Sequence, residues 1–225
     1  MGTPEERRPY PPTPVGHHGG GVGSAPLPQL TRRAEHSEAT RQALISAARH
    51  LFATRGYADT SIELIVQRAR VTRGALYHHF EDKRQLFRAV YEEVARELAH
   101  TVEAATETEP RPELYLEVGC NVYLDACMDP GIQRIALLDG PSVLGWKDWH
   151  EIEAESTLGM LTEALRLAMD AAYLERQPVE PLAALVFGAL GEAGMFIARA
   201  DHADDARAAM GRTVGRLIEG LKSRS

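Results

Sequence analysis

Hydrophobic positions recur at helical spacing along most of the chain after residue 37. Leu44, Ala48, Leu51 and Phe52 repeat at intervals of one to four residues, and Gly56 follows them. This pattern places an apolar stripe along one face of a helix, and glycine is a frequent helix terminator. We therefore predict a first helix that ends at Gly56.

Three further helices are expected at short intervals. Thr60 and Glu63 open an apolar run with the spacing of a capping box, in which the Thr60 hydroxyl accepts a hydrogen bond from the Glu63 amide. This predicts a short second helix that ends at about residue 68. A third helix should start after Thr72 and a fourth near Asp82, because both residue types are good N-caps.

The rest of the chain also favours helices, and no segment alternates like a strand. Pro130, Pro141 and Pro178 predict breaks between helices over about 113–128, 132–139, 145–174, 179–200 and 203–222. The predicted fold class is all-α, with a three-helix N-terminal head and a larger helical C-terminal domain.

The first 36 residues have a different composition. They are rich in Pro and Gly and carry no hydrophobic period, so they bury too little apolar surface to offset the entropy lost on ordering. We predict a disordered arm over residues 1–36, a head over 37–82 and a helical domain over 83–225.

The net charge of −7 is unevenly distributed. Residues 31–98 hold 12 Lys and Arg against 9 Asp and Glu, whereas residues 99–225 hold 11 against 21. A basic head on an acidic body suits a protein that presents one end to phosphates. An imbalance of this size also arises by chance, so it supports that interpretation without proving it.

Cysteine usage and hydropathy bear on the compartment. Cys120 and Cys127 lie on one predicted helix, about 10 Å apart, which is too far for a disulfide. The apolar stretch over residues 182–190 is too short to span a bilayer, and no apolar signal segment follows Arg7 and Arg8. We expect a reduced, cytoplasmic protein that does not enter the membrane.

Only Ala69, Arg70 and Val71 separate the second and third helices, which is the spacing of a helix-turn-helix. The match extends from Thr40 to Leu86 and includes Gly56-Tyr57, the run Val71-Thr72-Arg73-Gly74-Ala75-Leu76-Tyr77-His78-His79-Phe80, and Asp82-Lys83. This stretch closely resembles the N-terminal motif of the tetracycline-repressor family. The resemblance implies a transcription regulator that binds a double-stranded DNA operator, forms a homodimer and binds a small-molecule effector.

We expect nine residues to face DNA: Thr60, Ser61, Thr72, Arg73, Gly74, Ala75, Tyr77, His78 and Lys83. The first turn of the third helix would face base edges, with Arg73 contacting guanine O6 and N7 and small residues permitting close approach. The resemblance implies phosphate contacts for Tyr77 and His78.

Other phosphate contacts are expected from helix N-termini. Lys83 would add its ammonium to the amide donors that open the fourth helix, and Thr60 and Ser61 would anchor the other DNA strand. The alternatives are that Thr60 and Thr72 only cap helices, that Arg73 is a solvated charge and that Tyr77 packs on the core.

Arg70 departs from the family pattern, which usually has glycine in this turn. If the position requires a positive φ, arginine costs about 1 kcal/mol relative to glycine. The departure bears on the docking geometry, and Arg70 itself can add a phosphate contact.

For the effector pocket we expect apolar and adaptable side chains of the central helices. The candidates are Tyr123, Cys127, Met128, Trp146, Trp149, His150, Met160 and Phe187, with Asp139 as a further polar anchor. The alternative for each is an ordinary place in the core.

Gly188, Gly191 and Gly194 fall within one predicted helix, where each glycine costs about 1 kcal/mol. Close approach of another helix would justify them, and the resemblance implies a dimer interface built from the last two helices. The alternative is close packing within one subunit or against a ligand.

The function predicted from these features is a DNA-binding regulator, a repressor that a small-molecule effector releases from its operator. Alternatives are a ligand-independent DNA-binding protein and an enzyme with a helical head. The sequence lacks the nucleophile-elbow, zinc-protease and phosphate-loop motifs, so we expect no enzyme activity, no cofactor and no metal site.

Overall fold

The computed structural model describes residues 30–111 and 114–222, and in these ranges it is helical, with one isolated bridge between Leu174 and Lys222. The elements are α1 (Leu30–Arg55), α2 (Ile62–Ala69), α3 (Arg73–His79), α4 (Lys83–Glu107), α5 (Tyr115–Ala126), α6 (Pro130–Ile132), the π-helix η2 (Gln133–Asp139), α7 (Gly140–Ala154), α8 (Thr157–Asp170), α9 (Val179–Ala198) and α10 (Ala203–Glu219). The all-α prediction is confirmed.

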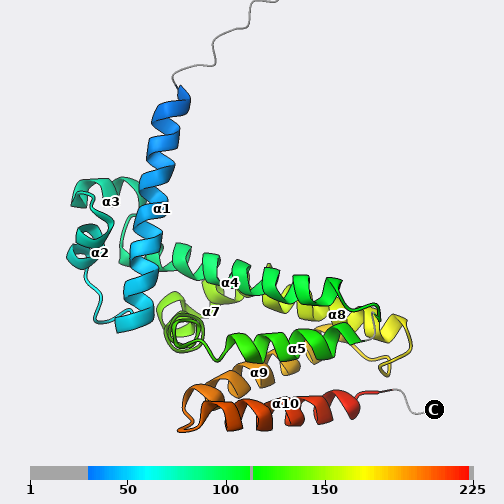
Figure 1. The fold of residues 1–225 in the computed structure, drawn as a ribbon. Helices are drawn as coiled ribbons and strands as arrows, with labels where there is room; N and C mark the ends of the chain where they lie inside the picture. The colour runs from blue at the N-terminus through cyan, green and yellow to red at the C-terminus, as the bar shows by residue number, and fades with distance from the viewer. Residues whose placement is uncertain (1–29, 112–113, 223–225) are drawn as a thin grey trace, which may run out of the picture.

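Helix α1 stands across one end of α4, with α2 and α3 beside it, and α4 to α10 form the larger body (Figure 1). Two hydrophobic clusters stabilise this arrangement. One joins the head helices through buried residues such as Phe52, Leu76 and Phe87, and the other fills the body around Leu124 and Leu165.

Helix α4 belongs to both clusters. Its first half places Leu86 and Val90 in the head cluster, whereas Leu98 lies in the body cluster. The head cluster also includes Ile135 of η2 and Ile152 of α7. The predicted domain boundary at residue 82 therefore lies just before a helix that both cores share.

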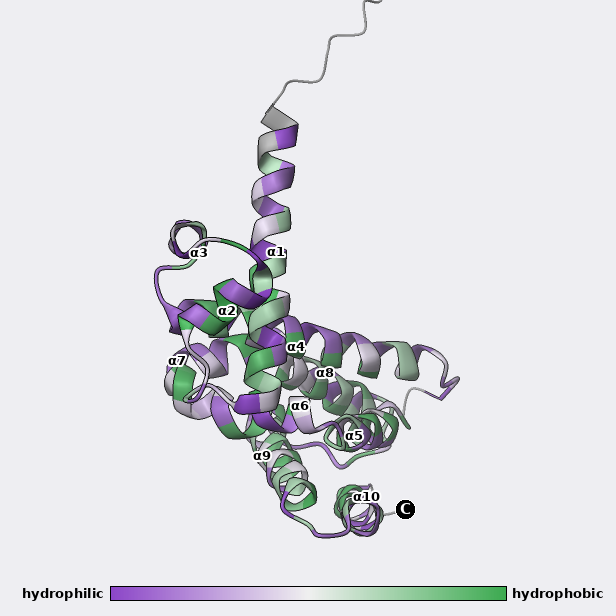
Figure 2. Ribbon diagram, turned by 60° about the vertical axis from the view of Figure 1, so that its left-hand side comes forward, coloured by the Kyte–Doolittle hydropathy of each residue, from purple (hydrophilic) through white to green (hydrophobic). Residues whose placement is uncertain are grey.

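The structure begins its first helix earlier than the sequence predicted. Helix α1 starts at Leu30, so residues 30–36 are helical where we predicted part of a disordered arm, and residues 1–29 lie outside the described residues. The last proline before this helix is Pro28, and residues such as Ala34 and Glu35 favour helix. The outer end of α1 is strongly hydrophilic (Figure 2).

The predicted helix over 145–174 is two helices. Ser156 leaves helical geometry, with φ −132° and ψ −112°, and its hydroxyl donates to the Ile152 carbonyl at 2.7 Å. Such local side-chain bonds compete with the helical ladder. The predicted α-helix over 132–139 is instead the π-helix η2, which widens the turn just before Gly140.

Candidate nucleic-acid interface and ligand cavities

Helices α2 and α3 form the predicted helix-turn-helix. The Ser61 hydroxyl caps α2 by accepting from the Leu64 amide at 3.3 Å, and the Thr72 hydroxyl caps α3 by accepting from the Ala75 amide at 3.1 Å. Ile65 and Leu76 are fully buried and fix each short helix to the head core. Because packing and caps both act on them, these short helices need little intrinsic propensity.

Arg70 forms the turn between the two helices in the left-handed region, with φ 57° and ψ 40°. Its amide donates to the Gln67 carbonyl at 3.2 Å and closes α2. The positive φ considered from the sequence is therefore present, at a cost of about 1 kcal/mol relative to glycine. The side chain of Arg70 is exposed at the turn.

The first turn of α3 is open to solvent. Thr72, Arg73 and Gly74 are exposed, and a Cβ placed on Gly74 would meet only the Thr72 hydroxyl oxygen, at 3.9 Å. Ala75 is half-buried. Small residues here leave room for another molecule to approach the α3 backbone.

Arg73 is held by two exposed partners. Its guanidinium pairs with Glu63 at 2.8 Å and donates to the Tyr77 hydroxyl at 3.3 Å. All three side chains lie largely in solvent, where an ion pair contributes only about 0–1 kcal/mol. The guanidinium can therefore exchange Glu63 for a ligand at little cost. His78 and Ser61 are exposed as well.

The prediction for Thr60 is corrected. Thr60 is 0% exposed, and its hydroxyl donates to the carbonyls of Gly56 at 2.7 Å and Leu51 at 3.3 Å. It therefore neither reaches a phosphate nor caps the Glu63 amide. Ser61 caps α2 in its place, one residue later than the capping box predicted.

Lys83 already has partners within the protein. Its ammonium lies 4.0 Å from the centre of the Tyr57 ring and donates to the carbonyls of Tyr57 at 2.8 Å and Thr60 at 3.0 Å. Burial lowers the pKa of this lysine. The N-terminus of α4 is capped by the Asp82 carboxylate, which accepts from the Gln85 amide at 2.7 Å. Lys83 thus helps to fix the loop between α1 and α2 with two of its three N–H donors, and its phosphate contact stays a prediction.

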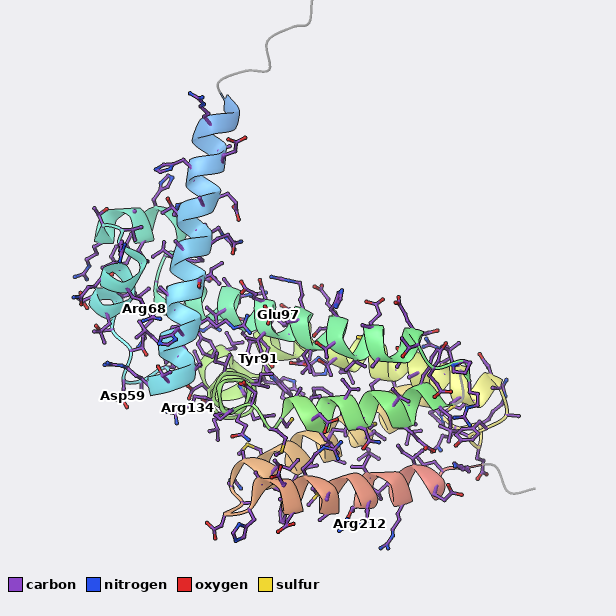
Figure 3. All side chains as sticks on the ribbon, in the orientation of Figure 1. Asp59, Arg68, Tyr91, Glu97, Arg134 and Arg212 are labelled. Atoms are coloured by element: carbon purple, nitrogen blue, oxygen red, sulfur yellow. The ribbon has the colours of Figure 1, made fainter. Side chains whose placement is uncertain are left out.

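Two groups of polar contacts tie the loop after α1 and the first turn of α4 to η2 and α7. The Tyr57 amide donates to Asp139 of η2 at 2.8 Å, and Arg134, which lies below the end of α1 (Figure 3), approaches the same carboxylate at 3.4 Å. Asp139 was predicted as an effector anchor, and this is corrected, because its carboxylate faces the head.

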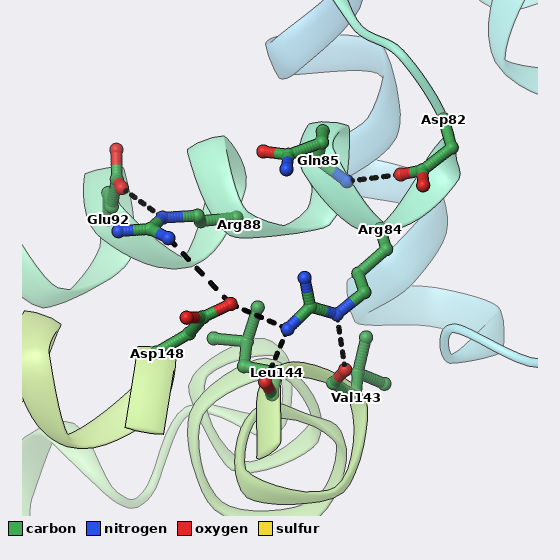
Figure 4. Close-up of polar contacts among 8 residues, drawn as sticks. All are labelled: Asp82, Arg84, Gln85, Arg88, Glu92, Val143, Leu144 and Asp148. Atoms are coloured by element: carbon green, nitrogen blue, oxygen red, sulfur yellow. Dashed lines mark hydrogen bonds and ion pairs between the residues drawn. The ribbon is translucent and has the colours of Figure 1, made fainter. Parts of the chain in front are cut away.

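The second group centres on Arg84 of α4 (Figure 4). Its guanidinium donates to the Leu144 carbonyl and to Asp148, both at 2.6 Å, and to the Val143 carbonyl at 3.2 Å. Arg88 approaches Asp148 at 3.7 Å from the next turn. Sequence reasoning missed these residues, since the partners are about sixty positions apart and no local pattern joins them.

Among the cavities of the body, two of about 320 Å³ each are lined by the predicted pocket residues. The first, here called the apolar cavity, lies among α4, α5 and α8 and is lined by Met160, Leu116 and Val102. The second, here called the aromatic cavity, is lined by the rings of Tyr91, Tyr123, Trp146, Trp149, His150 and Phe187 and by Glu153. Tyr123 lines both cavities. Five of the predicted pocket residues line the aromatic cavity: Tyr123, Trp146, Trp149, His150 and Phe187.

Cys127 and Met128 line neither cavity, which corrects those two predictions. Cys127 is buried against Gly194, and Met128 packs on the body core. Cys120 and Cys127 are both free, and burial raises the pKa of their thiols to about 12 and about 11.

A chain of hydrogen bonds crosses the wall of the aromatic cavity. The Trp149 indole donates to the Tyr91 hydroxyl at 2.8 Å, and the Tyr91 hydroxyl donates to the Glu153 carboxylate. Glu153 is 7% exposed, and burial raises its pKa, against the opposing effect of Tyr91. No local sequence signal marks Tyr91 and Glu153, because the two residues lie on different helices and are 62 positions apart in the chain.

The three glycines of α9 have different surroundings. Gly188 is exposed and Gly191 half-exposed, and a Cβ on either would meet nothing within 4 Å. Gly194 is buried, where a Cβ would lie 2.9 Å from Cys127 Sγ and 3.0 Å from Leu137. Gly194 therefore serves packing within the subunit, which corrects its assignment to the dimer interface.

The outer surface of α9 and α10 is apolar and uncovered. Leu185 is 73% exposed, Phe196 50% and Leu217 56%. In Figure 2 much of α9 is coloured as hydrophobic. Helix α9 is long and apolar enough to cross a membrane by length and composition alone, which is weak support for a membrane span because core helices of other proteins pass the same test.

Two family profiles match the chain. The profile described as "Bacterial regulatory proteins, tetR family" matches residues 44–90, and "Tetracyclin repressor-like, C-terminal domain" matches residues 115–221. The first covers the helix-turn-helix and the second covers most of the body that holds both cavities.

One solved structure and two curated proteins show further what this chain is similar to. A TetR-family transcriptional regulator from Pectobacterium atrosepticum is 32% identical, with a TM-score of 0.73 over 85% of this chain and 98% of that chain. The TetC protein of transposon Tn10 from Escherichia coli is 32% identical over 56% of this chain and 63% of its own length. The HTH-type transcriptional regulator TtgR from Pseudomonas putida is 37% identical over 43% of this chain and 49% of its own length.

The chain thus spans between half and two thirds of these two curated relatives, and nearly all of the solved one. With a matching profile at each end and a helix-turn-helix of the expected geometry, the chain belongs to the tetR family of bacterial regulatory proteins.

Proposed function

We propose that this protein is a homodimeric repressor that binds a DNA operator through α2 and α3 and is released by a small molecule. The observation that carries the proposal is the exposed first turn of α3, where Gly74 leaves room and Arg73 holds only an exposed, exchangeable partner. Arginine at this position fits the O6 and N7 acceptors of guanine in the major groove.

Ser61, Thr72, Ala75, Tyr77 and His78 would complete the DNA-facing surface. Tyr77 is 46% exposed although it is a large aromatic residue, and its hydroxyl lies beside Arg73. We propose that the protein acts in the cytoplasm, where bacterial DNA lies, and that it has no enzyme activity.

Dimerisation is proposed through the outer faces of α9 and α10. Leu185, Phe196 and Leu217 expose apolar surface there, and Gly188 permits close approach of a second helix. A symmetric dimer would place two copies of α3 on half-sites about 34 Å apart.

The effector is proposed to bind in the aromatic cavity. Its wall includes Trp146 and Trp149 of α7, the helix that Arg84 ties to the first turn of α4. A ligand that moves α7 would therefore move the base of the head. A ligand that binds one conformation of α7 more tightly than another shifts the protein towards that conformation and so changes its affinity for DNA.

Fluorescence anisotropy with labelled DNA from upstream of the gene tests the proposal. Tyr77→Ala should weaken binding strongly without changing thermal stability, because Tyr77 is largely exposed. The control is Arg212→Ala, an exposed residue on α10 at the opposite side of the molecule (Figure 3). Unchanged affinity for Tyr77→Ala, or no specific binding by the wild type, would reject the proposed interface.

A ligand-independent DNA-binding protein is the competing function. It predicts the same anisotropy results but no change of operator affinity with any small molecule. The two cavities of the body favour the ligand-controlled function.

A further inference from the structure

The aromatic cavity offers an unusual set of groups to a ligand. Its rings converge from four helices, α4, α5, α7 and α9, and Trp149 contacts both Trp146 and Phe187 with ring centroids 5.5 and 5.8 Å apart. The apolar cavity has no comparable ring cluster, and its acidic residues Glu103 and Glu163 are exposed.

Two donors of this ring cluster are used within the protein. The Trp149 N–H donates to Tyr91, and the Tyr91 O–H donates to Glu153. The cavity therefore presents the faces of aromatic rings and the acceptor oxygens of a carboxylate, and its lining also includes the polar side chains of Trp146, His150 and Thr157. Ring faces carry negative charge density, and so does the carboxylate.

The charges around the cavity have the same sign. Its lining, all from described residues, includes Glu153 and Glu192 but no lysine or arginine. His150 is the one basic side chain there, and its ring stacks at 5.1 Å from that of Trp146. Burial of a carboxylate is costly and raises the pKa of Glu153, while the Tyr91 hydrogen bond and the charge of His150 act in the opposite direction.

We propose that the aromatic cavity binds an organic cation, a quaternary or protonated amine with an apolar substituent, whose charge lies between the ring faces and Glu153. This rests on the proposed function in one respect only, that the bound molecule acts as the effector. The volume of about 320 Å³ suits a small drug-sized molecule. Cation–π contacts and a desolvated carboxylate both strengthen as water leaves the site.

Intrinsic fluorescence tests the proposal directly, because Trp146 and Trp149 are the only tryptophans of the chain and both line the cavity. The probes are benzyltrimethylammonium and its uncharged carbon isostere, neopentylbenzene, added to the purified full-length protein without DNA. Saturable quenching by the cation, at least about tenfold tighter than by the isostere, is the expected result. Equal affinities would overturn the proposal, and so would absence of saturable binding by the cation.

Glu153→Gln isolates the carboxylate. It keeps the shape and an acceptor for Tyr91, and should weaken the cation about tenfold while leaving the isostere unchanged. Glu163→Gln is the matched control, since it removes an exposed carboxylate from the apolar cavity. If cation affinity is the same in Glu153→Gln as in the wild type, Glu153 is not its partner and the proposal fails.

Trp146→Leu gives a second, independent variant that does not threaten folding, because Trp146 is 73% exposed. It should weaken the cation more than the isostere, with Trp149 as the remaining reporter. A separate operator titration by anisotropy keeps the two claims apart. Failure to bind DNA would refute the proposed function alone, whereas tight cation binding with no effect on operator affinity would refute the effector role and leave the site in place.

Discussion

At the level of single residues, some polar side chains of the head are exposed, and others are hydrogen-bonded within the protein. Arg73 and Tyr77 lie in solvent, whereas Thr60 and Lys83 satisfy carbonyls of the α1–α2 loop. All four residue types suit DNA contact, but only exposed groups can exchange partners cheaply. Burial therefore decides which of them face a ligand.

Arg73→Ala should change which operator sequences are preferred. Loss of a bidentate contact to guanine removes about 1–3 kcal/mol of discrimination at one base pair of each half-site. Selection from a randomised operator library measures this, with Arg212→Ala as the control for loss of an exposed arginine elsewhere. Identical preferred sites for Arg73→Ala and the wild type would make Arg73 a bystander.

Glu153 should make stability depend on pH in a defined direction. Its pKa is raised by burial, so above the ordinary value of 4.5 the unfolded carboxyl ionises before the folded one. The folded state then loses relative stability as the pH rises, and Glu153→Gln escapes this loss.

The expected result is that the melting temperature of Glu153→Gln rises relative to that of the wild type as the pH increases from 4.5. Thermal denaturation of both proteins at increasing pH measures the difference, which removes effects common to the two. A difference that is flat or falls with pH would contradict the burial of an uncompensated carboxyl.

At the scale of elements, helical rotation separates residues that look equivalent in sequence. Steps of three residues turn a helix by about 300°, so Gly188 and Gly194 point about 120° apart. Gly188 accordingly is exposed and lines the aromatic cavity, whereas Gly194 packs on Cys127 and Leu137. The two positions should respond differently to the same substitution.

Gly188→Leu should leave the subunit folded and shift the dimer towards monomer, because its Cβ position is open within the subunit. Gly194→Leu should instead lower stability by about 1–3 kcal/mol through overpacking, with dimerisation retained in the folded protein. Light scattering and chemical denaturation measure the two effects. A normal dimer for Gly188→Leu would remove Gly188 from the proposed interface.

Helix α4 connects the head to the proposed effector site. It contributes Leu86 to the head core, Arg84 to the contacts with α7, and Tyr91 to the aromatic cavity. These groups lie within two turns of one rigid helix. A ligand beside Tyr91 is therefore mechanically close to the head, although the predicted domain boundary falls at the start of this helix.

At the scale of the whole molecule, charge and shape act together. The segment 31–98 carries more basic than acidic residues, and residues 99–225 carry an acidic excess. The head projects from the body with α3 at its outer side (Figure 1). Phosphates would thus meet the basic end while the acidic body is held away from DNA.

Operator binding should depend steeply on salt. Each neutralised phosphate contributes about −0.9 to the slope of log K against log salt, so contacts from two heads should give a slope steeper than about −3. Anisotropy titrations at several salt concentrations measure it, and Gly188→Leu, as a monomer, should show a shallower slope. A shallow slope for the wild type would contradict a two-headed complex.

The sequence by itself determined the fold class, the helix-turn-helix and the exposed turn of α3. These depend on local physics: the apolar period, the N-cap at Thr72 and a turn of three residues between α2 and α3. Each signal acts over a few residues, so it can be read from the chain directly. The predicted aromatic residues of the cavity also follow from a general preference of pockets for such side chains.

Only the tertiary structure decided which polar groups are free. Thr60 and Lys83 turn inward because the α1–α2 loop has carbonyls that need donors, and Asp139 faces the head because η2 brings it to the Tyr57 amide. Glu153 lies in the wall of the aromatic cavity, where Tyr91 of another helix donates a hydrogen bond to it. Long-range partners and the direction of a side chain have no local sequence period, since they depend on how helices pack.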